Sequence, residues 1–172
     1  MDSEGFTEFI TPGRLMLMKS GKIFHHEEAV HENVEGLQIF IRPGQKDNRP
    51  EVIFEELGEI HSENKWRLIA SPDKGKRPLQ FSSQTWIYDI RISPRKIFNL
   101  PQDFEENLHC LLYVFQGSMT INDHIQLGKG ESLFIQGENI HFQTNYTAEI
   151  VLFVTDKESP YYAGGMYSGN QK

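Results

Sequence analysis

Short apolar runs separated by turn residues recur along most of the chain, and this pattern constrains the fold more than any other feature. Pro, Gly and Ser bound almost every run, as at Thr11-Pro12-Gly13 and at Pro43-Gly44. Many short strands at close spacing with turns between them predict an all-β sandwich or barrel. The runs that we interpret as strands are 5–10, 14–18, 36–44, 65–71, 84–92, 96–100, 109–123, 131–135, 140–144 and 148–154.

Some of these segments carry more specific expectations. The run 109–123 is expected to form two strands that meet at Gly117-Ser118, and 84–92 has apolar residues at both parities, which predicts a strand covered on both faces. Residues 50–57 begin with a proline and are compatible with either a short helix or a strand. Residues 71–80 read as an exposed loop. The tail 159–172 is either a flexible end or a strap whose tyrosines dock on the body of the protein.

Composition limits the classes of protein that the chain can represent. Its 172 residues, 38% of them hydrophobic and 12% aromatic, suit one ordinary domain or somewhat more, with a real core. The net charge of −7 and the lack of a basic cluster argue against direct nucleic-acid binding.

The single cysteine, Cys110, excludes an internal disulfide and a cysteine-based zinc site, and its apolar surroundings predict a buried thiol. No apolar stretch is long enough to span a bilayer, and no signal peptide opens the sequence, so a cytoplasmic protein without membrane contact is expected.

Two stretches share one pattern. Both 12–27 (PGRLMLMKSGKIFHHE) and 129–143 (KGESLFIQGENIHFQ) place a glycine, an apolar run, a second turn glycine and a histidine in the same order. The distance from Gly13 to His25 is twelve positions, and that from Gly130 to His141 is eleven. The pattern indicates an internal duplication in which a turn enters a strand, a second turn leaves it, and the histidine starts the next strand.

The second stretch resembles the cupin superfamily. Residues 130–141 fit the spacing of the second conserved cupin element, with Gln136 at the proline position, and YVFQG at 113–117 matches the end of the first element. The resemblance implies a jelly-roll barrel in which His141 is a structural or pocket histidine. It also implies that this barrel has lost its metal site, because the places of the two histidines and the glutamate hold Phe104, Glu106 and Cys110.

The first stretch is similar to the pirin family of bicupins. SGKIFHHE at 20–27, followed by VEGLQIFIRP at 34–43, carries this resemblance, which extends over about 5–156. By it, His25 and Glu27 occupy the places of two of the four iron ligands of the family. The other two belong to a His-x-His pair upstream, and no histidine precedes His25 in this sequence. We therefore expect an all-β bicupin with an incomplete N-terminal barrel.

The chemistry of the site leaves its metal content open. His25 and Glu27 alternate along a strand and can face the same side. Iron(II) oxygenases use about three histidine or carboxylate ligands, so two hold a metal weakly. Fe(II) or another divalent metal would need ligands from a further segment or from a second chain. Without them the site binds no metal, and both residues serve as hydrogen-bonding groups. Recruitment of His31 or His61 would require a loop to fold inward.

These observations predict a domain organisation and an oligomer. Residues 1–60 are expected to form a partial N-terminal cupin domain, 61–157 a C-terminal cupin domain, and 158–172 a tail. An incomplete barrel exposes strand edges, which proteins usually cover. A homodimer in which the two partial halves pair is therefore expected, or a strap from the tyrosine-rich tail that covers these edges.

Three functions fit the sequence. The first is a non-catalytic binding or regulatory module with a degenerate metal site, whose partner is a small aromatic ligand or a protein. The second is a metal-dependent, quercetinase-like dioxygenase with His25 and Glu27 as iron ligands and Glu27 or Glu28 as base. The third is a small-ligand barrel in the second half, with His109, Tyr113 and His141 in its pocket, unless these three residues belong to core and rim packing.

Overall fold

The computed structural model describes residues 8–21, 29, 31–46, 48–73, 75, 79–101 and 108–163. Within these ranges every regular element is a β-strand, which confirms the predicted all-β class, and no helix there could cross a membrane. The strands are β1 (Arg14–Lys19), β2 (Glu51–Glu56), β3 (Arg67–Ala70), β4 (Thr85–Ile92), β5 (Ile97–Asn99), β6 (Leu108–Gln116), β7 (Ser118–Ile121), β8 (Ile125–Gly128), β9 (Ser132–Gln136), β10 (His141–Gln143) and β11 (Ala148–Asp156).

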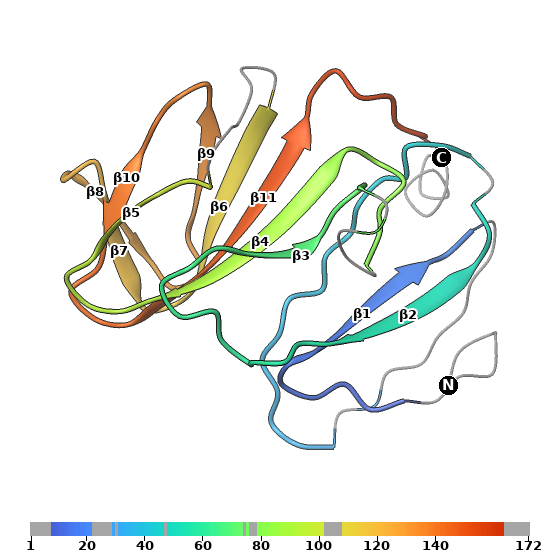
Figure 1. Ribbon diagram of the computed structural model, residues 1–172, viewed down its shortest axis with the longest axis horizontal. Coiled ribbons are helices and arrows are strands. Elements are labelled where there is room, and N and C mark those ends of the chain that lie inside the picture. The colour runs from blue at the N-terminus through green and yellow to red at the C-terminus, as the bar shows by residue number, and fades with distance from the viewer. Residues whose placement is uncertain are drawn as a thin grey trace, which may run out of the picture.

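Two antiparallel sheets from the second part of the chain form a jelly-roll barrel (Figure 1). The larger has the strand order β3-β4-β11-β6-β9, and the smaller has the order β5-β10-β7-β8. The longest ladders join β11 to β4 and to β6, with Leu152 opposite both Tyr88 and Leu112. The connections between consecutive strands cross repeatedly from one sheet to the other, which is the arrangement expected of a cupin.

The space between the two sheets is filled by apolar side chains. Alternate residues of β6, Cys110, Leu112 and Val114, are buried, and the alternate residues of β11 meet them. This period of two is what a strand with one face on the core requires. The largest fully buried side chains are Phe142, Ile90, Ile92, Leu112, Met119, Ile121, Ile150, Leu152, Val114 and Val154.

The internal repeat has a structural counterpart in the backbone. Gly13 and Gly130 precede β1 and β9 with φ of 86° and 82°, and Gly21 and Gly137 follow these strands with φ of 57° and 65°. Such positive φ angles favour glycine because they bring Cβ of other residues against the backbone. The turn–strand–turn interpretation of both stretches is confirmed up to these glycines, while 22–28, with His25 and Glu27, lie outside the described residues.

The first part of the chain differs from its prediction. β1 and β2 pair as a two-stranded sheet, with Met16 opposite Phe54, so 50–57 is a strand and not a helix. The strand predicted at 36–44 is wrong, because no ladder includes these residues and they run as an extended segment. The incomplete N-terminal barrel and the division near residue 60 remain predictions.

Most predicted strands of the second part are present. β4 is covered on both faces as expected, since Thr85 and Ile87 are buried at one parity and Ile90 and Ile92 at the other. Gly117 separates β6 from β7, as predicted, with φ of 80°. The sequence analysis missed β8, whose four residues mix polar and apolar side chains and lie too close to β7 to stand out as a separate run.

Candidate functional site

The outer face of the five-stranded sheet, which points away from the barrel core, carries the candidate site. Arg91, Glu149 and Gln116 lie side by side at one end of β4, β11 and β6. Further along the same strands come the apolar side chains of Ile87, Phe153 and Leu111, which are opposite one another in the ladders. This face therefore has a polar end and an apolar centre.

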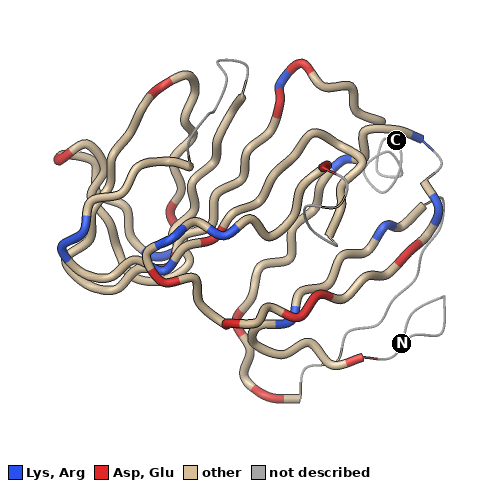
Figure 2. Tube along the Cα trace, viewed as in Figure 1, with Lys and Arg blue, Asp and Glu red and all other residues tan. Residues whose placement is uncertain are grey.

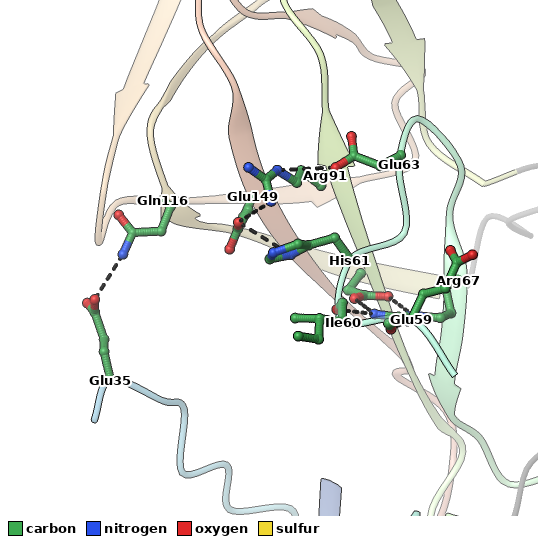
Figure 3. Close-up of polar contacts among 10 residues, drawn as sticks. Glu35, Glu59, Ile60, His61, Glu63, Arg67, Arg91, Gln116 and Glu149 are labelled. Atoms are coloured by element: carbon green, nitrogen blue, oxygen red, sulfur yellow. Dashed lines mark hydrogen bonds and ion pairs between the residues drawn. The ribbon is translucent and has the colours of Figure 1, made fainter. Parts of the chain in front are cut away.

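An ion pair of Arg91 with Glu63 and a contact of His61 with Glu149 fix the polar end to the connection between β2 and β3 (Figure 3). Glu149 Oε1 lies 3.5 Å from His61 Nδ1 and 3.8 Å from Arg91 Nη1. Nε of Arg91 lies 3.3 Å from Oε1 of Glu63 on the same connection. These contacts place the chain between β2 and β3 over the start of β11.

Arg67 at the start of β3 holds the same connection in place. Its Nε donates to Oδ1 of Asp89 at 2.9 Å and its Nη2 to Oδ2, while Nη1 and Nη2 donate to the backbone carbonyls of Glu59 and Ile60. The hydrogen bond with Asp89 outweighs the effect of burial and raises the pKa of Arg67 above its ordinary value. Arg67 is therefore a charged anchor for 57–66.

An extended stretch, residues 31–43, which we call the crossing segment, lies over this face and is held near both ends. Near its start, Glu35 accepts a hydrogen bond from Gln116 Nε2 at 2.9 Å, drawn in Figure 3, and pairs with Lys129 Nζ at 2.6 Å. These partners belong to β6 and to the turn after β8. The start of the crossing segment is therefore tied to the rim of the barrel.

The tail holds the other end of the crossing segment. Arg42 Nη1 donates to the carbonyl of Ala163 at 3.0 Å, and its guanidinium lies 5.7 Å from the ring centre of Tyr161. The backbone N–H of Tyr162 donates to the carbonyl of Pro43 at 2.8 Å. Residues 161–163 therefore dock on the body of the protein, as the strap interpretation of the tail predicted, and 164–172 lie outside the described residues.

Between these two attachments the crossing segment and the sheet enclose a groove, which we call the outer groove. Its volume of about 540 Å³ lies within the range of small-molecule sites. Apolar side chains provide most of its wall, and Tyr113, Thr85, Gln38 and Arg42 provide polar groups. The residues that line it are Leu37, Gln38, Ile39, Phe40, Ile41, Arg42, Thr85, Leu111, Tyr113 and Phe153.

The structure separates the three predicted pocket residues. Tyr113 lines the outer groove. His109 is on the same face of β6, where its Nε2 lies 2.8 Å from Nε2 of Gln136 and its ring contacts Phe134 edge-on. His141 is on β10 in the other sheet, 3.3 Å from a carboxylate oxygen of Asp123. His141 therefore shares no pocket with the other two, and the space inside the barrel is packed with core side chains.

The predicted metal positions are not assembled within the described residues. His25, Glu27, Phe104 and Glu106 lie outside them, and the described ranges contain no group of three or more His, Cys, Asp or Glu residues that could hold a metal ion. Cys110 is buried in the core, and burial raises the pKa of its thiol to about 11. The described side chains of the C-terminal barrel therefore do not fit a metal.

Sequence reasoning missed most of the outer groove. The alternation of β6 places Leu111 on the same face as His109 and Tyr113, and this signal was available in the sequence. The contacts of Glu35 with Lys129 and of Arg42 with the tail join segments far apart in the chain, so no local pattern predicts them.

Comparison with known families shows to which protein family the chain belongs. A family model described as the quercetinase C-terminal cupin domain matches residues 68–154, from β3 to β11, which is half of the chain. The chain belongs to the pirin-like cupins. The matched region coincides with the barrel, so this pirin-like chain carries the C-terminal cupin fold of the family, as the sequence predicted.

Solved structures share the same fold. YhhW from Escherichia coli is 21% identical, with a TM-score of 0.77 over 95% of this chain and 68% of its own. GK1651 from Geobacillus kaustophilus is 19% identical, with a TM-score of 0.68 over 93% of this chain and 70% of its own. Quercetin 2,3-dioxygenase from Acinetobacter baumannii is 18% identical, with a TM-score of 0.54 over 73% of this chain and 46% of its own.

A further match is bacterial pirin YhhW from Escherichia coli in complex with nickel(II), 19% identical, with a TM-score of 0.56 over 69% of this chain. This pirin-like chain spans only 48% of that protein and about two thirds of YhhW in the other structure. At these identities the likeness concerns the fold. No curated protein matches the chain significantly in sequence.

Proposed function

We propose that this pirin-like chain is a non-catalytic binding or regulatory module. The observation that carries the proposal is the packing of the C-terminal cupin barrel, and it bears on this barrel alone, because 22–28 lie outside the described residues. Phe142, Leu112 and Leu152 are fully buried within a continuous apolar core, where a catalytic cupin would need a metal and space for substrate. The residues at former ligand places, Cys110 and His141, point respectively into this core and out of it.

The outer groove supports the binding role. It combines an apolar wall from Leu37, Ile39, Leu111 and Phe153 with a few polar groups, which is the usual make-up of a small-molecule site. Both of its walls are fixed, one as a sheet and the other by the contacts at the two ends of the crossing segment. The chemistry suits a small, largely apolar molecule such as an aromatic compound.

A fluorescence titration with anilinonaphthalene sulfonate, an aromatic probe that brightens in apolar surroundings, tests this role. We expect saturable binding to the folded protein. Leu111→Glu and Phe40→Glu place a charge on opposite walls, and each should weaken binding about tenfold or more because a carboxylate is costly beside apolar groups. Ile97→Glu, an exposed position on β5 of the other sheet, is the matched control and should bind as the wild type does.

Circular dichroism and thermal unfolding establish that each variant is folded. Binding that is unaffected by both groove variants, or that only the control weakens, would contradict a binding role for the outer groove. Absence of binding by the folded wild type would contradict it as well.

A second candidate function is a metal-dependent dioxygenase. The matched family model bears the name of quercetinase, and one structural relative is a quercetin 2,3-dioxygenase, which favours this alternative. His25 and Glu27 would then hold Fe(II) or another divalent metal, with further ligands from another segment or a second chain. The bound metal would supply the activation of oxygen. Flavonol-dependent oxygen uptake after incubation with Fe(II) or Ni(II) distinguishes the two functions.

A further inference from the structure

β9 forms one edge of the five-stranded sheet, and β6 is the only described strand that pairs with it. Val114 N donates to the carbonyl of Glu131, and Gly130 N donates to the carbonyl of Val114. Along an antiparallel ladder, hydrogen-bonded residue pairs alternate with pairs that are not hydrogen-bonded. Leu133 and Ile135 therefore belong to hydrogen-bonded pairs, and their N–H and C=O groups point to β6. The backbone groups of Ser132, Phe134 and Gln136 consequently point away from β6, to an edge at which no described strand pairs with them.

The apolar row on the outer face becomes more exposed toward this edge. Ile87, Phe153, Leu111 and Phe134 are opposite one another across β4, β11, β6 and β9. Ile87 is 5% exposed, Leu111 is 39% exposed and Phe134 is 58% exposed. A row of large apolar side chains that ends uncovered at a sheet edge is typical of a surface that another protein covers.

The five residues of β9 carry no charge, although Glu131 precedes the strand and Glu138 follows it. Natural edge strands avoid association through charged side chains, proline or cover by other segments. β9 reads Ser-Leu-Phe-Ile-Gln and has none of these residues, and Figure 2 shows no charged position along β9 or β6. The opposite edge, β3, begins with the charged Arg67, and Ser71 at its end is hydrogen-bonded to Leu79 and Phe81.

We propose that two copies of this chain form a symmetric dimer by antiparallel pairing of their β9 strands. Phe134 is the central residue of β9, so a twofold axis there places Phe134 opposite Phe134 of the second copy, Ser132 opposite Gln136, and Leu133 opposite Ile135. Phe134 exchanges both backbone hydrogen bonds with its counterpart. Glu131 comes to lie opposite Gly137 and Glu138 opposite Gly130, so neither glutamate is directly opposite a like charge.

The features of β9 favour a second copy of this chain as the partner that pairs with its edge. An isologous interface must fit itself, and a short uncharged strand with an aromatic residue at its centre does so. The two five-stranded sheets become one continuous sheet, and the apolar rows of both copies meet at the axis and cover Phe134 and Leu111. The inference does not rest on the proposed function, because it is argued from the β9 edge alone, although Leu111, which the dimer covers, also lines the outer groove.

Sedimentation velocity and light scattering test the dimer. The wild type should be a dimer at micromolar concentrations, and Phe134→Lys and Phe134→Glu should each be monomeric, because like charges then face each other at the axis. The substituted side chain is exposed, so both variants should keep the fold. Ile97→Lys, at an exposed apolar residue that begins the edge strand β5 of the other sheet, should remain a dimer.

Mixing the two charged variants makes the test specific to the axis. Lysine then faces glutamate, and an equimolar mixture of Phe134→Lys and Phe134→Glu should recover the dimer. A monomeric wild type would overturn the proposal, as would a dimer that survives both single variants. Failure of the mixture to associate, when each variant alone is a folded monomer, would overturn pairing at Phe134.

Discussion

Cys110 points into the cupin barrel and His141 points out of it, although the resemblance of the sequence to cupins puts both at ligand positions. Cys110 is packed in the core among Leu112, Val114 and Val154. His141 and its neighbour Phe142 point to opposite faces of β10. Phe142 is fully buried, and His141 contacts Asp123 at the surface. These two side chains therefore cannot meet at one ion, and the barrel is a packed structural unit.

The Cys110 thiol is expected to be unreactive in the folded protein. Burial raises its pKa to about 11, so the thiolate that reacts with alkylating reagents is scarce at neutral pH. The raised pKa means that the contribution of the neutral thiol to stability is fully present below the pKa of the unfolded chain and is lost as the pH rises toward 11. Thiol titration with and without denaturant measures the reactivity, and rapid labelling of the native protein would contradict the buried position.

Arg67→Ala should lower the free energy of unfolding by about 2 kcal/mol, because it leaves the half-buried Asp89 and two carbonyl groups without their donor. Urea unfolding measures the change. Arg91→Ala removes longer and more exposed ion pairs and should cost less than about 1 kcal/mol. Equal effects of the two substitutions would show that Arg67 does not anchor 57–66.

Gly117→Ala should destabilise the barrel by more than about 1 kcal/mol. Gly117 has φ of 80°, and a Cβ there would lie 2.5 Å from the carbonyl oxygen of Thr147. Gly128→Ala is the control, since φ is not positive and the nearest atom is a side-chain oxygen of Glu131 at 3.6 Å. Thermal unfolding of both variants gives the comparison, and a neutral Gly117→Ala would contradict the tight β6–β7 turn.

Glu35→Ala should release the start of the crossing segment without unfolding the barrel. The substitution removes the contacts with Gln116 and Lys129, which are exposed and contribute little to global stability. Hydrogen exchange of 36–41 should accelerate, and binding of the aromatic probe should weaken. Glu51→Ala, which removes the exposed pair with Lys19 in the two-stranded sheet, is the control and should change neither. Unchanged exchange in Glu35→Ala would mean that other contacts hold the segment.

The second half of the fold was predictable because its strands carry local signals. The apolar runs at 109–116 and 148–154 and the turn glycines at 117, 130 and 137 are properties of short stretches that predict strands and turns, while the resemblance of 113–117 and 130–141 implied the cupin barrel. The strand at 36–44 was predicted by the same reasoning and is wrong, since apolar β-branched residues favour a strand only where a partner strand is available to pair with them.

The candidate site was harder to predict than the fold. Tyr113 was identified, but its companions Leu111 and Phe153 are apolar residues that sequence reasoning assigns to a core by default. The attachments of the crossing segment join Glu35 to Lys129 and Arg42 to Ala163 across most of the chain. Tertiary contacts of this kind leave no periodic or motif signal, so only the structure reveals the outer groove.

Metal content measured by elemental analysis tests the central claim most directly. The protein should be purified without a histidine tag, incubated with Fe(II) or Ni(II), freed of excess ion, and compared with His25→Ala at a known oligomeric state. A non-catalytic module predicts far less than one ion per chain in both proteins and no flavonol-dependent oxygen uptake. About one ion per chain in the wild type, lost in His25→Ala and accompanied by oxygen uptake, would contradict the account and identify a dioxygenase.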